Sequence, residues 1–519
     1  MKATKLSLAI ASLISAGFAG QALALDLYVD NKTQQIFAEP GPNRSKLGSF
    51  EKVEDHADQK AEINKIKEEL ALKNNEIKAL DEHVKDPKYG ELQINEKGIK
   101  FESKDGNFEM SLNGRMQVDS QMNVQDANTT TTAAPVPTSQ LADGSNIRRA
   151  RLGVEGSFFK DYEYKFEYDF SRGGNSGVAA GITDAYLNWK GYSNLGVKIG
   201  SFKEPFSLEE ATSNRWITFI ERNMAVNSFS DNPNAYKTGI GLTWAEPRWQ
   251  AAGALMTEPV GGGWAYTTSK GGNGNNNRNG GSGDTGFEIT GRITGLPWYV
   301  DKNKFLHVGA SGSERWMPNN LGGGNNAMAY TAAINSNVDR SNVLNTGIIP
   351  LGSTLTRMGG ETAVVYGPFS AQAEYIQTDI SNGSKAANAS LVDGATLKGY
   401  YGYVSYFLTG ESRSYKAKTG AWDRLKPSRN FDMKGGKGAW EVAAGYDYLN
   451  LNSKGINGGE ANTAKFGVNW YPNSHFKVMA NYIHVLDIQQ SSALSLTKHG
   501  ASWNGGNLDM FEMRGQVDF

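Results

Sequence analysis

The sequence predicts an all-β fold, a 16-stranded antiparallel transmembrane β-barrel with an N-terminal periplasmic coiled-coil helix. Three observations predict it. From about residue 107 onward, segments of about 9 to 14 residues alternate apolar and polar side chains with period two, which is typical of strands. The apolar face is a thin coat of Tyr, Trp, Phe, Gly and Ala, whereas the other face carries charges, as in barrels with lipid outside and water inside. A heptad pattern is confined to residues 50–86.

Composition excludes several other classes of protein. The chain has 519 residues with 53 Lys+Arg, 54 Asp+Glu, 61 Gly and no Cys. Hydrophobic residues make up 39% and the mean hydropathy is -0.49, which excludes a helical membrane protein with its spans of about 20 apolar residues. The absence of Cys excludes a disulfide scaffold. The nearly balanced charge disfavours a nucleic-acid binder.

The first residues predict export. Lys2 and Lys5 give a positive start, residues 6–18 are apolar, and Ala22-Leu23-Ala24 matches a cleavage site for signal peptidase. We therefore expect a signal peptide over 1–24 and a mature chain that begins at Leu25. A retained membrane anchor is the alternative, but no stop-transfer segment follows Ala24.

The next segments are expected to be periplasmic. Residues 25–49 contain Pro and Gly and are predicted to be irregular, 50–86 to be a coiled-coil helix, and 87–106 to be a linker. One heptad position carries Ile63, Leu70, Ile77 and Val84, and the other carries Ile66 and Leu80. So narrow an apolar seam favours a trimeric bundle. The alternative is a single amphipathic helix packed on the barrel.

The barrel domain is predicted over 107–519. Its strands are expected to start near Asn107, Ile147, Asp161, Gly181, Gly196, Lys237, Arg248, Asp284, Lys304, Ser353, Phe369, Thr396, Ala439, Glu460, His475 and Leu508. Short turns such as 159–161, 192–194 and 471–473 are expected on the periplasmic side. The long connections 257–283, 317–352 and 410–438 are expected to be extracellular loops. Trp189, Trp440, Trp470 and Tyr471 are candidates for aromatic girdles at the membrane interfaces.

The polar faces of the first strands carry the candidate anion-binding residues. Arg115 lies on the polar face of the first strand, and Arg149 and Arg151 alternate with apolar residues on the second, so all three are expected to line the lumen. Arg148 has the opposite parity, but a bend at the start of its strand would turn it inward. Guanidinium groups offer paired donors to an oxyanion and keep their charge at physiological pH. The alternative is that these arginines pair with lumen acids such as Glu155 and Glu163 in a charge-balanced wall.

Three stretches of the chain resemble the phosphate-selective porin O/P family. They are 148–153 together with 164–170, Phe202-Lys203-Glu204-Pro205-Phe206-Ser207-Leu208-Glu209 followed by Arg215-Trp216, and Leu408-Thr409-Gly410-Glu411-Ser412-Arg413. The resemblance extends over most of the barrel. It implies a homotrimer of sixteen-stranded barrels whose third loop folds into the pore. It also implies arginines along the approach, for which Arg115, Arg148 and Arg149 are the matching positions.

By the same resemblance, Lys203 is expected to be the lysine at the constriction and Arg215 its arginine neighbour. The third loop is expected within 204–235, where the strand pattern is lost. This loop also carries Glu204, Glu209, Glu210, Glu221 and Asp231. Carboxylates that face the pore would oppose anion passage, and the family's run of closely spaced loop arginines is not recognisable here.

The sequence therefore predicts an outer-membrane porin for passive diffusion of small anions, with phosphate or polyphosphate as the leading solutes. The alternative is a weakly selective general or carbohydrate porin with the same barrel. No enzyme, cofactor or metal site is predicted, because the four His outside the helix are too dispersed to form one. A barrel hydrolase or an adhesin with binding loops is a more remote alternative. The expected partners are two further copies of the chain, outer-membrane lipid, anionic solutes, and the cell wall or a periplasmic protein at the coiled coil; nucleic acid is not among them.

Overall fold

The computed structural model describes residues 25–33, 35–50, 57–85, 90–95, 98–128, 141–172, 181–231, 235–257, 266–267, 286–316, 326–327, 329–339, 341–347, 349, 353–381, 392–489 and 502–519. The predicted signal peptide, 1–24, lies outside them. The chain divides into two compact units, Met1–Asp86 and Pro87–Phe519. No helix among the described residues is both long enough and apolar enough to cross a membrane.

The first unit contains a small sheet and one helix. Strands β1 (Leu25–Asp30), β2 (Ile36–Phe37) and β3 (Arg44–Phe50) form an antiparallel sheet in the order β2-β1-β3. The prediction that 25–49 is irregular is therefore wrong. Its strands are too short for a recognisable alternation, and local contacts help to fix them. For example, the Asp30 carboxylate accepts the N–H groups of Lys32 and Thr33 at 2.9 Å each.

Helix α2 (Ala57–Lys85) lies within the predicted helical range. The seam residues whose side chains are described, Ile66, Leu70, Ile77 and Leu80, are 57–63% exposed in the isolated chain. A surface helix would normally bury such a stripe. The coiled-coil pairing of α2 stays a prediction.

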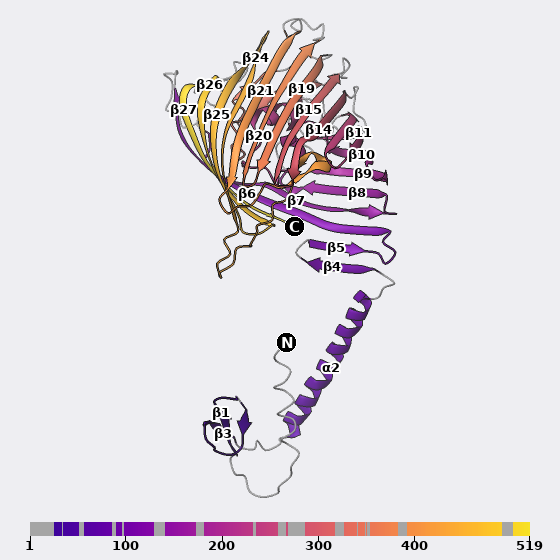
Figure 1. Ribbon diagram of the computed structural model, residues 1–519, viewed down its shortest axis with the longest axis vertical. Coiled ribbons are helices and arrows are strands. Elements are labelled where there is room, and N and C mark those ends of the chain that lie inside the picture. The colour runs from indigo at the N-terminus through magenta and orange to yellow at the C-terminus, as the bar shows by residue number, and fades with distance from the viewer. Residues whose placement is uncertain are drawn as a thin grey trace. The chain divides into compact units, whose positions relative to one another are not determined.

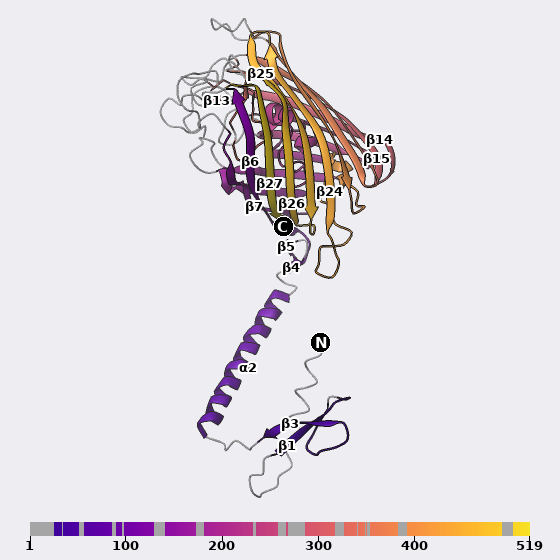
Figure 2. The same cartoon turned by 90° about the vertical axis from the view of Figure 1, so that its left-hand side faces the viewer.

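The second unit is the barrel (Figures 1 and 2). Within the described residues, sixteen long antiparallel strands close on themselves, in agreement with the prediction. They are β6 (Phe108–Asn128), β7 (Gly144–Phe158), β8 (Tyr162–Asp169), β9 (Ile182–Tyr192), β10 (Leu195–Lys203), β11 (Tyr236–Ala245), β12 (Trp249–Met256), β14 (Phe287–Asp301), β15 (Lys304–Trp316), β19 (Thr354–Tyr366), β20 (Phe369–Ser381), β21 (Ala395–Phe407), β24 (Ala439–Ser453), β25 (Ile456–Tyr471), β26 (Phe476–Gln489) and β27 (Ser502–Asp518).

The barrel closes where β27 pairs with β6, from Asp518 opposite Arg115 to Ser502 opposite Asn128 (Figure 2). Strand β6 continues beyond the end of β27. A hairpin of β4 (Glu91–Asn95) and β5 (Gly98–Glu102) pairs with this free part of its edge. Part of the predicted linker 87–106 is therefore sheet. An unpaired edge exposes backbone donors and acceptors, and the hairpin satisfies those of the start of β6.

Alternate residues of the strands face lipid and lumen, as the period-two pattern predicts. On β6, Met116 and Val118 are 47% and 39% exposed, whereas Arg115 and Gln117 between them are 6% and 0% exposed. We call the two ends of the barrel the turn end, where β7 connects to β8, and the loop end, where β10 connects to β11. The C-terminus lies at the turn end (Figure 1).

One long connection lies at the end opposite to the one predicted. Residues 408–438, between β21 and β24, lie at the turn end, where the N–H of Phe431 donates to the Pro472 carbonyl at 2.7 Å. The connection from β24 to β25 at the loop end is, by contrast, a tight turn. Antiparallel strands reverse direction at every connection, so the end that a connection occupies is fixed by counting strands and not by its length.

Aromatic rings gather at the turn end of the outer face. The rings of Trp440 and Trp470 stack at 5.6 Å, and both Nε1 atoms donate to the Lys437 carbonyl, at 3.2 and 3.0 Å. Trp189 packs edge-on against Tyr192 at 5.7 Å. These rings fit a girdle at a membrane interface. Tyr471 does not, because its hydroxyl donates to the buried Glu441 carboxylate at 2.8 Å.

Candidate functional site

The third connection at the loop end, 204–235 between β10 and β11, folds into the barrel, as predicted. This third loop contains the short helices α3 (Leu208–Ala211) and α4 (Met224–Val226) and the π-helical turn η2 (Asn227–Asp231). The Glu374 carboxylate on β20 accepts the N–H groups of Leu208 and Glu209, at 3.0 and 2.7 Å. Lys477 on β26 donates to the Ile217 carbonyl at 2.7 Å. Since these strands lie far around the barrel from β10, the loop crosses the lumen.

Arg357 on β19 holds both ends of the third loop. Its Nη1 and Nη2 donate to the Glu204 carboxylate at 2.9 and 2.6 Å, and Nη1 also donates to the Phe229 carbonyl at 2.5 Å. Glu204 and Glu288 both accept from Lys237 at 2.7 Å. All four charged side chains are at most 2% exposed. Buried charges are stable only when paired in this way.

The turn-end segment, 408–438, enters the lumen from the other side. Its short strands β22 (Tyr415–Lys416) and β23 (Ala421–Trp422) pair with each other. The ring of Trp422 is buried, and its Nε1 donates to the Gln372 side chain at 2.5 Å. The backbone N–H of Trp422 donates to the Thr212 hydroxyl of the third loop at 3.3 Å. The two inserted segments therefore meet at Trp422.

Outside the lumen, the turn-end segment is fixed by its own polar contacts. The N–H of Gly436, the guanidinium of Arg429 and the N–H of Lys434 all donate to the Asp432 carboxylate and lower its pKa.

Arg115 and Arg151 lie on the lumen face, as predicted, and both bind Glu167. Arg115 Nη2 lies 2.8 Å from each carboxylate oxygen of Glu167, and Arg151 Nη1 lies 2.9 Å from Oε1. Arg151 Nε also donates to Asp169 at 2.8 Å. The Glu167 side chain is fully buried. These two arginines are therefore charge-paired.

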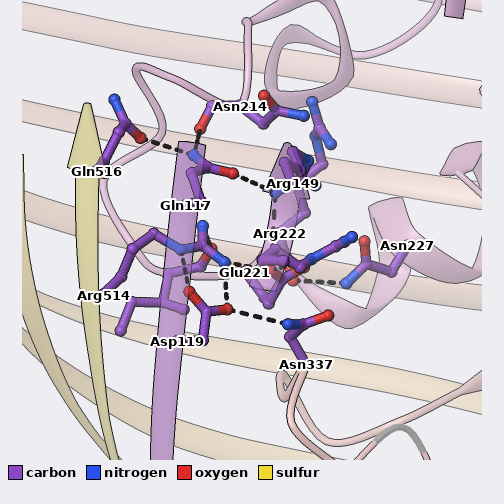
Figure 3. Close-up of polar contacts among 12 residues, drawn as sticks. Gln117, Asp119, Arg149, Asn214, Glu221, Arg222, Asn227, Asn337, Arg514 and Gln516 are labelled. Carbon is purple, nitrogen blue, oxygen red and sulfur yellow. Dashed lines mark hydrogen bonds and ion pairs between the residues drawn. The ribbon is translucent and has the colours of Figure 1, made fainter. Parts of the chain in front are cut away.

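Arg148 faces inward because of a β-bulge. Gln117 on β6 pairs with Arg149 and Val118 with Ile147, so Arg148 is the extra residue between them. The bulge turns Arg148 inward, beside Arg149, which faces the lumen by its parity. Arg148 Nε and Nη2 donate to the Glu221 carboxylate at 2.7 and 3.0 Å. Arg149 Nη1 donates to Gln117 at 2.9 Å and lies 4.0 Å from Glu221 (Figure 3).

Lys203 ends β10, directly before the third loop, and Arg215 lies within the loop, after α3. Lys203 Nζ contacts the Glu210 carboxylate at 2.6 Å and donates to its carbonyl at 2.7 Å. The nearest acidic partner of Arg215 is Glu167, 3.7 Å from its Nη2. Within the described residues, Nε and Nη2 of Arg215 are buried and have no hydrogen-bond partner. Of the six predicted site residues, Arg149 and Arg215 are thus the least neutralised, with their nearest acids at 4.0 and 3.7 Å.

The structure brings the predicted site residues together with acids other than those expected. Glu155 and Glu163 bind Lys165 and Lys190 instead of arginines. The acids at the arginines are Glu167, Asp169 and Glu221. Arg514, on the polar face of the last strand, completes the cluster at Glu221, at 2.7 Å. Barrel closure against β6 signals this neighbour, because the last strand of a closed barrel pairs with the first.

Comparison with known proteins identifies the family. Residues 111–519 match the family described as phosphate-selective porin O and P. The chain belongs to this family. It is an outer-membrane β-barrel porin and not an enzyme. Porins of this type are typically trimeric.

Individual relatives are more distant. The porin is 28% identical over 421 residues to Porin O of Pseudomonas aeruginosa, which covers 74% of this chain and 85% of the relative. An uncharacterized protein of Caulobacter vibrioides is 26% identical over 356 residues, 68% of this chain and 65% of the relative. Among solved structures, the anion-selective porin from Comamonas acidovorans aligns with a TM-score of 0.45 and 11% identity over 79% of this chain and all of the other. The outer-membrane channel DcaP of Acinetobacter baumannii aligns with a TM-score of 0.43 and 14% identity over 81% and 99%. Both scores are too low to support a functional comparison.

Proposed function

We propose that this porin conducts small anions, with phosphate or polyphosphate as the leading solutes. The observation that carries the proposal is the set of buried guanidinium N–H groups that have no hydrogen-bond partner in the described residues. On the predicted site residues they are Nε of Arg115, Nε of Arg149, and Nε and Nη2 of Arg215; Nη2 of Arg413 in the turn-end segment is a further one. A buried donor without an acceptor is costly, and these donors are concentrated beside the third loop. An oxyanion that passes the loop can accept their hydrogen bonds.

The charge pairing of the wall favours weak binding. Glu167, Asp169, Glu221 and Glu210 neutralise most of the basic groups at the site. A conducting pore needs sites that solutes can leave as well as enter. The same pairing supports the second candidate, a weakly selective general or carbohydrate porin.

The expected result for the wild type in a planar bilayer under a KCl gradient is an anion-favouring reversal potential. Added phosphate should block the chloride current saturably. The Arg215→Gln variant should need a several-fold higher phosphate concentration for half-block, because a guanidinium with two unpartnered buried donors is lost. As a control, Arg429→Gln at the exposed turn-end segment should leave the block unchanged. A reversal potential near zero without block would instead favour the general porin.

We further propose that α2 forms a trimeric coiled coil in the periplasm, toward the cell wall or a periplasmic partner. Support comes from the exposed seam of Ile66, Leu70, Ile77 and Leu80, which two further copies would cover.

Deleting residues 25–86 tests this modular arrangement. The single-channel conductance should stay the same, because the pore belongs to the second unit, whereas the trimer should dissociate at a lower temperature in detergent. Bilayer recordings and the gel migration of heated samples measure the two effects. If the truncated barrel failed to fold, the modular arrangement would be wrong.

A further inference from the structure

Glu221 of the third loop lies in the middle of an arginine cluster built by two strands on either side of β6, at the barrel closure. Arg148 and Arg149 come from β7, and Arg514 comes from β27, with β6 between these strands. Figure 3 shows Arg514 reaching both Glu221 and Asp119, with Arg149 close by. Glu221 Oε1 accepts from Arg148 Nε at 2.7 Å and from Arg514 Nη2 at 2.7 Å, and Oε2 accepts from Arg148 Nη2 at 3.0 Å.

This arrangement has the chemistry of a bound oxyanion. Two parallel N–H groups of the Arg148 guanidinium donate to the two carboxylate oxygens of Glu221, and the Arg514 guanidinium donates a third hydrogen bond. Arginine recognises free carboxylates and phosphates with the same donors. Two of the basic groups that the sequence and the family suggest for solute binding, Arg148 and Arg149, are thus turned toward a side chain of the protein itself.

We propose that Glu221 is a tethered competitor: its carboxylate occupies an oxyanion site formed by Arg148, Arg149 and Arg514, and a solute oxyanion binds there only by displacing it. The inference rests on the proposed anion conduction and adds a mechanism for its weak affinity. A tethered ligand competes at an effective concentration in the millimolar range or above, so it weakens the binding of a free anion without removing the site.

The loop does not need Glu221 to keep its place. On one side of it, Asn469 donates to the Thr218 carbonyl at 2.9 Å. On the other side, Arg222 donates to the carbonyls of Glu209 and Thr212 at 3.1 and 3.0 Å. The N–H of Met224 donates to Asp447 at 2.7 Å. The backbone is therefore fastened on both sides of the carboxylate by groups that a substitution of Glu221 leaves intact.

Removal of the carboxylate would affect the three arginines differently. Arg514 keeps a second acid, because its Nε and Nη2 donate to Asp119 at 2.6 and 2.7 Å. Glu221 is the acidic partner of Arg148, and Nε of Arg149 has no partner among the described residues. Arg148 is also the most exposed of the three, with 12% of its side chain accessible. The site that Glu221 leaves would therefore be formed mainly by Arg148 and Arg149, with Arg514 shared with Asp119.

The test is phosphate block of the chloride current in planar bilayers, with the full-length protein. Glu221→Ala should be half-blocked at a roughly tenfold lower phosphate concentration than the wild type, because the loss of a charged competitor restores at least one strong hydrogen-bonded pair. Glu221→Gln keeps the shape of the side chain and should shift the block in the same direction. Adding Arg148→Gln to Glu221→Ala should abolish the gain.

Glu441→Gln is the matched control. Glu441 is a buried lumen carboxylate that accepts from the Asn469 amide and the Tyr471 hydroxyl. Its substitution removes one negative charge from the lumen, as the Glu221 variants do, but it frees no arginine side chains. If half-block in both Glu221 variants moved no further than in Glu441→Gln, the tethered competitor would be refuted. The reversal potential of the wild type tests the proposed anion conduction separately. An anion-favouring potential with no gain in block would overturn this inference alone, whereas a cation-favouring potential would overturn the proposed function.

Discussion

The Arg357→Met variant is expected to pass several times more current per channel than the wild type and to lose part of its ion selectivity. Arg357 binds Glu204 at the start of the third loop and the Phe229 carbonyl near its end. Methionine fills much of the space but offers no donor, so Glu204 and Glu288 would lose a shared cation in a buried site. Removing one partner of a buried ion pair costs about 3–5 kcal/mol. The loop should then leave the lumen part of the time.

Single-channel conductance in planar bilayers measures this effect. Arg429→Met is the control, because Arg429 pairs with Asp432 on the exposed surface of the turn-end segment, where an ion pair contributes little. It should conduct like the wild type. An unchanged conductance in Arg357→Met would show that the contacts with β20, β24 and β26 are enough to keep the third loop in the lumen, without the contacts that Arg357 makes at the two ends of the loop.

The period-two pattern was sufficient to predict the barrel and its lumen face. Met116 outside and Arg115 inside follow from parity alone, because a strand in a barrel wall has one lipid face and one water face. The predicted strand starts lie within six residues of those observed, and the largest difference is between Leu508 and Ser502. The third loop was also predictable, because its alternation is lost within a region of clear strands.

The alternation of residues no longer predicts which side chains face the lumen where the pairing between two strands is irregular. Arg148 has the parity of a lipid-facing residue, and only the bulge opposite Gln117 and Val118 turns it inward. A bulge depends on the register between two strands, and no single strand sequence encodes that register. The hairpin β4–β5 was missed for a similar reason, since its partner is the free edge left by the length difference between β6 and β27.

Charge pairing was the least predictable feature. Glu163 and Glu167 both lie on the polar face of β8, yet only Glu167 meets Arg115 and Arg151, because position along the strand decides which neighbour is in reach. Glu221 meets its arginines only after the third loop has folded across the lumen. Contacts of this kind are long-range in sequence, so composition indicates that acids balance bases but not which acid binds which base.

The Trp422→Ala variant is expected to open the lumen from the turn end. Trp422 packs with Leu208 of the third loop in one buried apolar cluster, and the Arg413 guanidinium lies 3.8 Å from the centre of its ring. Truncation of a buried Trp costs about 3–5 kcal/mol through lost contacts and the cavity left behind. The turn-end segment should therefore detach from the wall, and the single-channel conductance should rise with larger current fluctuations. Trp440→Ala, at the outer face, should alter thermal stability but not conductance.

The double variant Arg357→Met/Trp422→Ala shows whether the two inserted segments restrict the pore together. Trp422 touches the third loop through Thr212, so freeing the turn-end segment also removes a support of that loop. Substitutions that share a contact are not additive. We expect the double variant to conduct more than either single variant but less than the product of the two separate increases. Independent increases that multiply would mean that each segment narrows the pore on its own, and the contact at Trp422 would then have no part in setting the conductance.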